Sequence, residues 1–122
     1  MTPKVLIVDD SATVRKACRL FLLEEDFEVI ITSDAARVLD IIAEIKPDVV
    51  VTDIMMPEMD GYTFLRRLRE EESLASLPVI IMSSKKRESM EGLFASCGIS
   101  AYLEKPFGRK EFVKTIQGVL GR

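Results

Sequence analysis

Histidine is absent from this chain of 122 residues, and cysteine occurs only twice, as Cys18 and Cys97. The first absence excludes a phosphohistidine, an imidazole base and an imidazole metal ligand within the chain. The two cysteines offer neither zinc-site spacing nor a disulfide framework, which is typical of a reduced, cytosolic protein. The glycine patterns GxGxxG and GxxxxGK(S/T) are also missing, so the sequence shows no phosphate-binding loop of a nucleotide enzyme.

Long apolar runs and a basic surplus are missing as well. No apolar run approaches the ~20 residues that a membrane-spanning helix needs. Only Lys4 precedes a short run that aspartates interrupt, so we expect no signal peptide and a cytoplasmic location. The net charge of −3 disfavours nucleic-acid binding, which usually requires a basic face. The length and the 48 % hydrophobic content predict a single domain over 1–122, with no output domain in this chain.

Strand-like runs alternate with helix-like segments along the whole chain. The strand-like runs are KVLIV (4–8), FEVIIT (27–32), DVVVT (48–52), LPVIIM (77–82) and SAYLE (100–104). The segments with a helical apolar period are 11–25, 34–45, 61–72, 88–97 and 109–120. Continuous valine and isoleucine runs are typical of parallel strands that are buried on both faces. The pattern predicts an α/β fold, a doubly wound five-stranded parallel sheet with helices on both faces.

Chemically active side chains gather where the strand-like runs end. Such sheets bind ligands outside the carboxyl ends of their strands, and there the chain places Asp9, Asp10, Asp53, Ser83 and Lys105. Three carboxylates in one pocket repel one another, so they need a cation, and a hard, oxygen-preferring ion suits them. The pattern predicts Mg²⁺, with Mn²⁺ as a substitute, because Mg²⁺ takes one or two carboxylates together with waters and phosphate oxygens.

The same groups suit phosphoryl transfer. With Mg²⁺ bound, one carboxylate can attack phosphorus and form an aspartyl-phosphate. The reaction needs mainly positioning and cations around the phosphoryl oxygens. Lys105 supplies a second cation, and the hydroxyl of Ser83 can donate to a further oxygen.

Each residue alone also has a simpler explanation. Asp10 suits the N-cap of the first helix, and Asp53 suits a loop. Lys105 alone is best explained as a solvated surface amine, Ser83 as a satisfied hydroxyl, and Tyr102 as a half-buried strand residue. A flavodoxin would need a hydroxyl- and glycine-rich loop after the first strand, and an aspartate-based phosphatase a DxD pattern there. The coincidence of several strand ends favours phosphoryl chemistry.

Four stretches carry a resemblance to a known family, and they are VLIVDDSATVRK, PDVVVTDIMMPEMDGYTFLRRLR, LPVIIMSSK and AYLEKPF. In this order they resemble the receiver domains of response regulators in two-component signalling, the CheY-like superfamily. The resemblance covers nearly the whole chain and implies a flavodoxin-like (βα)5 fold with strand order 2-1-3-4-5. It implies a signalling phospho-acceptor rather than an enzyme, with self-catalysed phosphotransfer and slow autodephosphorylation.

The resemblance also implies a role for each site residue. Asp53 matches the phospho-acceptor and Asp10 a direct Mg²⁺ ligand, with Asp9 acting directly or through water. Met55 would lend its backbone carbonyl to the metal. Lys105 matches the lysine that in this family usually precedes a cis proline.

A switch and its partners follow from the same resemblance. Ser83 matches the switch hydroxyl, which moves onto the phosphoryl group, and Tyr102 matches the switch aromatic, which turns inward. This remodels the surface of the fourth helix, fifth strand and fifth helix. The implied partners are a histidine kinase or histidine phosphotransfer protein, and a downstream protein target or a covalently linked output domain. We expect no direct nucleic-acid binding, no membrane association and a monomer, because dimers in the family occur mainly where an output domain follows. A module of the same fold that has lost phosphorylation is the alternative.

Overall fold

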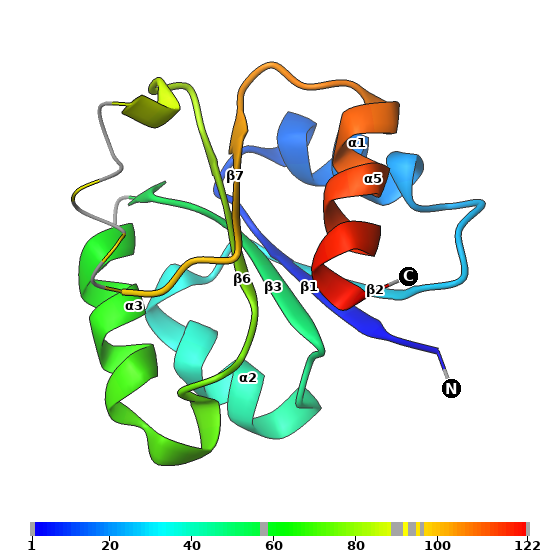
Figure 1. Cartoon of the computed structure of the whole chain (residues 1–122). Coiled ribbons are helices and arrows are strands. Elements are labelled where there is room, and N and C mark those ends of the chain that lie inside the picture. Colours follow the sequence, from blue (N-terminus) through cyan, green and yellow to red (C-terminus); the bar gives the residue numbers. More distant parts are fainter. Residues whose placement is uncertain (1, 57–58, 89–91, 93–94, 96, 122) are drawn as a thin grey trace.

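A five-stranded parallel sheet forms the centre of the computed structural model, which describes residues 2–121 apart from 57–58, 89–91, 93–94 and 96. The strands lie in the order β2-β1-β3-β6-β7 (Figure 1). Their bounds are β1 Lys4–Val8, β2 Glu28–Thr32, β3 Val49–Asp53, β6 Val79–Ser83 and β7 Ala101–Glu104. Counted along the chain, this order is 2-1-3-4-5, so the predicted flavodoxin-like topology is confirmed.

Helices cover both faces of this sheet (Figure 1). The helical elements are α1 Ala12–Phe21, η1 Ala35–Arg37, α2 Val38–Ile45, α3 Gly61–Glu70, η2 Glu72–Leu74 and α5 Arg109–Leu120. Helices α1 and α5 pack on one face, and α2 and α3 pack on the other. The helix predicted over 88–97 falls largely outside the described residues.

Alternate side chains of each central strand enter two separate cores. In β1, Leu6 and Val8 pack in the core beneath α2 and α3, whereas Val5 and Ile7 pack in the core beneath α1 and α5. This division follows from the side-chain period of two along a strand. All four side chains are fully buried, which explains why the sequence shows a continuous apolar run here rather than an alternating one.

The residue that caps the first helix is Ser11 and not Asp10. The hydroxyl Oγ of Ser11 accepts a hydrogen bond from the backbone N–H of Val14 at 3.3 Å, the usual geometry of an N-cap. The simpler explanation of Asp10 as the helix cap is therefore wrong. The carboxylate of Asp10 accepts no hydrogen bond from α1 in the described part of the chain, and the hydroxyl of Ser11 makes the capping contact instead.

Most elements begin or end one to four residues away from the predicted boundaries, and three of these differences affect the carboxyl edge of the sheet. Strands β3 and β6 each end one residue later than predicted, so Asp53 and Ser83 are the last residues of strands and not the residues after them. Asp53 pairs with Met82 in the ladder, and a polar residue at a strand end leaves no mark in an apolar pattern. The loop predicted after Asp53 contains a short antiparallel pair, β4 Met55–Met56 and β5 Met59–Asp60.

Candidate functional site

Three carboxylates meet at the carboxyl edge of the sheet. Asp9 and Asp10 follow β1, and Asp53 ends the neighbouring strand β3. One carboxylate oxygen from each residue lies within 4.8 Å of the other two. Asp9 has no exposed surface and Asp53 is 9 % exposed, whereas Asp10 is open to solvent. Adjacent parallel strands bring their ends together, which is why strand order alone could place these residues side by side.

Lys105 offsets part of this negative charge. Its ammonium Nζ donates to Oδ2 of Asp9 at 2.9 Å and to Oδ2 of Asp53 at 2.6 Å. Its backbone N–H donates to the carbonyl of Ser83 at 2.7 Å, which fixes the residue beside the end of β6. The peptide bond between Lys105 and Pro106 is cis. The Lys105 side chain is only 19 % exposed, so water screens these ion pairs less than it screens surface pairs.

Burial and ion pairing oppose each other in this cluster. Loss of hydration raises the pKa of the Asp9 carboxyl, although the hydrogen bonds from Lys105 and Ser11 favour its ionised form. Burial would lower the pKa of Lys105, but the hydrogen bonds to Asp53 and Asp9 outweigh burial and raise this pKa overall. Lys105 is therefore protonated at neutral pH and places a fixed positive charge between the two carboxylates.

Asp9 is anchored more firmly than Asp10. Its Oδ1 accepts from the backbone N–H of Ser11 at 2.8 Å, and its backbone carbonyl accepts from Nη1 of Arg15 at 2.7 Å. With Lys105 at Oδ2, each carboxylate oxygen of Asp9 already has a donor. The side chain of Asp10 makes no hydrogen bond or ion pair with the described part of the chain. Sequence reasoning missed Arg15, because its partner is a backbone carbonyl and no sequence pattern marks such a contact.

The side chains of Ser83 and Tyr102 both bind the backbone of Lys85. The hydroxyl of Ser83 accepts from the N–H of Lys85 at 3.1 Å, and the hydroxyl of Tyr102 donates to the Lys85 carbonyl at 2.7 Å. Ser83 is 3 % exposed and Tyr102 is 6 % exposed. Tyr102 is thus a buried residue and not a half-buried one. Ser83 directly follows Met82, the ladder partner of Asp53, so its hydroxyl lies at the same strand edge as the carboxylates.

The cluster's donor set fits a hard divalent cation. The ligand atoms that come together are all carboxylate oxygens, which suit Mg²⁺ and Mn²⁺ better than zinc or copper. Three carboxylates against one ammonium leave a net negative charge for an ion to neutralise. Met55 begins β4 two residues beyond Asp53, and the predicted contact of its carbonyl with the metal stays a prediction.

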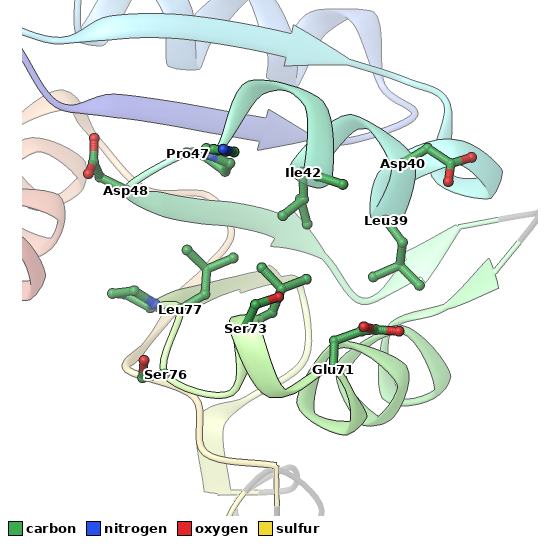
Figure 2. Close-up of a pocket in the computed structure, with 13 residues that line it drawn as sticks. Leu39, Asp40, Ile42, Pro47, Asp48, Glu71, Ser73, Ser76 and Leu77 are labelled. Atoms are coloured by element: carbon green, nitrogen blue, oxygen red, sulfur yellow. The ribbon is translucent and has the colours of Figure 1, made fainter.

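Two cavities flank the sheet but do not include the three carboxylates. A cavity of about 710 Å³ lies between α2 and η2, at the amino edge where Asp48 precedes β3 (Figure 2). Asp48 lies at one end of this cavity, and Asp40 and Glu71 lie at the other (Figure 2). The apolar side chains of Leu39, Ile42 and Leu77 lie between these acidic residues. A second cavity of about 210 Å³ lies between α1 and the segment after β7, and Lys105 lines it. The first cavity is therefore remote from the acidic chemistry, and the second adjoins it.

The comparisons with known proteins agree with this geometry. Residues 5–117 match the family model described as the response regulator receiver domain. The chain belongs to this family. The receiver domain is 35 % identical over 121 residues to Response regulator Rre1 of Synechocystis, covering 97 % of this chain and 52 % of that protein. It is 32 % identical over 118 residues to Sensor histidine kinase TmoS of Ectopseudomonas mendocina, covering 97 % of this chain and 12 % of that protein.

A solved structure supports the same assignment. The receiver domain superposes on the chemotaxis response regulator CheY4 of Vibrio cholerae with a TM-score of 0.91 and 28 % identity, covering 98 % of this chain and all of that one. Receiver domains act as phosphoryl acceptors in two-component signalling, and they interact with histidine kinases and output domains. They generally bind Mg²⁺ at an acidic pocket. In the part of this receiver domain that the structure describes, no helix has the length and apolarity to cross a membrane.

Proposed function

We propose that Asp53 accepts a phosphoryl group from a histidine kinase or a histidine phosphotransfer protein in a Mg²⁺-dependent reaction. The observation that carries this proposal is the meeting of three carboxylates with the ammonium of Lys105 at one strand edge. The 122 residues of the receiver domain include no histidine, so the phosphohistidine lies outside them. An Asp53 oxygen attacks phosphorus, a P–O bond forms, and the P–N bond breaks with its electron pair passing to the donor's imidazole.

The residues proposed to hold Mg²⁺ differ in how their oxygens are engaged. Asp10 has no hydrogen-bond partner in the described part of the chain, and we assign it as a direct ligand together with Asp53. Both oxygens of Asp9 already accept hydrogen bonds, so Asp9 acts through a bound water. The backbone carbonyl of Met55 completes the set. When bound, the ion supplies positive charge that offsets the charge of the phosphoryl oxygens.

We propose that the ammonium of Lys105, which binds Asp53 in the free chain, binds an oxygen of the phosphoryl group after transfer. The ammonium lies 2.6 Å from Oδ2 of Asp53, so the phosphoryl oxygens of an acyl phosphate there lie within its reach. Charge-assisted hydrogen bonds of this kind stabilise the transferring group. Hydrolysis of the acyl phosphate by water restores the carboxylate, and we propose that this autodephosphorylation is slow.

Ser83 and Tyr102 are proposed to form the switch. The hydroxyl oxygen of Ser83 accepts from Lys85, which leaves its own proton available for a phosphoryl oxygen. Movement of Ser83 towards that oxygen displaces the backbone of Lys85, which the hydroxyl of Tyr102 also binds. We propose that this remodels the surface formed by the fourth helix, β7 and α5. A downstream protein target or a covalently linked output domain would bind there.

Intact mass spectrometry after incubation with acetyl phosphate and Mg²⁺ tests the acceptor. We expect a mass gain of one phosphoryl group, which excess EDTA and the substitution Asp53→Asn each abolish. Asp40→Asn, at an exposed aspartate of α2, is the matched control and should leave the gain intact. No gain in the wild type would identify an interaction module without phosphorylation, and a gain that survives Asp53→Asn would place the acceptor elsewhere.

A further inference from the structure

Arg87 and Glu104 join the segment after β6 to the edge strand β7. The guanidinium Nη2 of Arg87 donates to the backbone carbonyl of Tyr102 at 2.9 Å. The backbone N–H of Arg87 donates to Oε1 of Glu104 at 2.8 Å. Arg87 therefore holds β7 at two points, and we refer to the pair Arg87 and Glu104 as the clasp.

Local geometry explains why these two residues meet. Tyr102 and Glu104 are two residues apart on β7, so their side chains leave the same face of the strand. Arg87 and the following residue have helical backbone, and the first N–H groups of a helical stretch have no partner within it. The carboxylate of Glu104 accepts a hydrogen bond from one such group, the backbone N–H of Arg87.

The clasp adds a second contact between Tyr102 and the segment after β6. The phenol hydroxyl binds the carbonyl of Lys85, and the backbone carbonyl of Tyr102 binds the guanidinium of Arg87, two residues further along. Tyr102 is thus held at both its hydroxyl and its backbone by the same short segment. A displacement of this segment must break both contacts or carry Tyr102 with it.

We infer that Arg87 and Glu104 are positioning residues that keep Tyr102 buried and couple it to the segment after Ser83. The coupling to phosphorylation rests on the proposed function, but the placement of Tyr102 does not. Each contact is a single hydrogen bond, exposed at Glu104 and partly buried at the Tyr102 carbonyl, so its loss changes the ratio of exposed to buried Tyr102 by about three- to tenfold.

Fluorine NMR of the chain labelled with 3-fluorotyrosine measures that ratio directly. The chain contains two tyrosines, so Tyr62 in α3 provides an internal reference signal. In Arg87→Ala we expect the Tyr102 signal to move towards its solvent-exposed position, with a larger H₂O/D₂O isotope shift, while the Tyr62 signal stays in place. Arg87→Lys retains a donor and should recover part of the wild-type signal.

Glu104 offers a second, finer comparison. Glu104→Gln keeps a side-chain carbonyl that accepts from the Arg87 N–H, so its Tyr102 signal should lie close to the wild type. Glu104→Ala removes the acceptor and should behave like Arg87→Ala. Arg109→Ala, which removes an exposed arginine and its ion pairs with Glu24 and Glu25, is the control and should leave both tyrosine signals unchanged.

Two measurements, the mass after incubation with acetyl phosphate and Mg²⁺ and the Tyr102 signal of the variants, separate the two proposals. A chain whose mass shows no phosphoryl gain would overturn the proposed function and leave the clasp to be judged from Tyr102 alone. An unchanged Tyr102 signal in both Arg87→Ala and Glu104→Ala would overturn the clasp, whatever happens at Asp53. Movement of the Tyr62 signal together with Tyr102 would show general loosening of the fold, which also overturns it.

Discussion

Arg69 shows how one side chain can organise backbone segments that are distant along the chain. Its guanidinium donates to five carbonyls at 2.9–3.2 Å, those of Leu74, Ala75, Leu77, Cys97 and Gly98. These carbonyls belong to the end of η2, to the connection between η2 and β6, and to the turn before β7. Burial lowers the pKa of Arg69, but guanidinium is charged at any physiological pH, so all its bonds are charge-assisted.

We predict that Arg69→Lys destabilises the fold by about 2 kcal/mol, because a lysine ammonium cannot span both segments and leaves carbonyls without a donor. Urea unfolding followed by circular dichroism measures the change. Arg66→Lys, at an exposed position on the same helix, is the matched control and should stay within about 0.5 kcal/mol of the wild type. Equal stability of the two variants would show that the carbonyls find water instead.

The acidic residues of the site and Lys105 could be predicted from the sequence, whereas the two arginines that bind backbone carbonyls, Arg15 and Arg69, could not. Asp9, Asp10 and Asp53 follow from strand ends that a parallel sheet brings together. Arg15 and Arg69 act through long side chains whose partners are backbone carbonyls, and every residue offers such a carbonyl. No spacing or composition marks those contacts, so only the folded geometry reveals them.

The turn before β7 and the helix α5 contain glycines with opposite consequences for stability. Gly98 has φ +66°, a left-handed conformation that side chains with a Cβ adopt at a cost. Gly118 lies within α5, exposed, with open space where a Cβ would be. The first glycine is required by its backbone, and the second only weakens its helix.

We predict that Gly98→Ala lowers the free energy of unfolding by about 1–2 kcal/mol and that Gly118→Ala raises it by about 0.5–1 kcal/mol. The two variants add the same methyl group, so they control for each other in a thermal or urea unfolding experiment. A change of the same sign in both would mean that the methyl group, and not the backbone conformation, decides the outcome.

At the scale of elements, apolar periodicity predicted the helices and strands that buried side chains define, and it missed very short strands and strand ends with polar residues. Helix α5 runs over 109–120 as predicted, because its buried residues recur at helical spacing. The pair β4 and β5 was missed, since a two-residue strand is too short to show any period. Strands β3 and β6 were predicted to end too early, because Asp53 and Ser83 end them with polar side chains.

At the scale of the whole molecule, we predict that Mg²⁺ stabilises the fold, because only the folded chain brings Asp9, Asp10 and Asp53 together. At about one hundred times the dissociation constant, bound Mg²⁺ should raise the free energy of unfolding by about 2.7 kcal/mol. The increase should vanish with EDTA and shrink strongly in Asp10→Asn, but persist in Asp40→Asn. The same increase in the wild type, Asp10→Asn and Asp40→Asn would locate the ion outside the carboxylate cluster.

The extent of the whole protein is a separate matter from its fold. The chain spans about half the length of the response regulator Rre1 and 12 % of the kinase TmoS. The single-domain organisation over 1–122, the monomeric state and the cytoplasmic location therefore stay predictions. The family and the topology, in contrast, follow from features spread along residues 5–117.

The division of β1 between two cores has a consequence for changes of chain length. Deleting one residue within Val5–Val8 would turn every later side chain of that strand to the opposite face, exchanging the contents of both cores and rotating Asp9 away from Lys105. Insertions in the turns at the amino edge of the sheet, such as the turn around Pro47, leave the alternation of side chains in the strands unchanged. Fusion partners and tags therefore belong outside the strands, where the count of residues carries no geometric meaning.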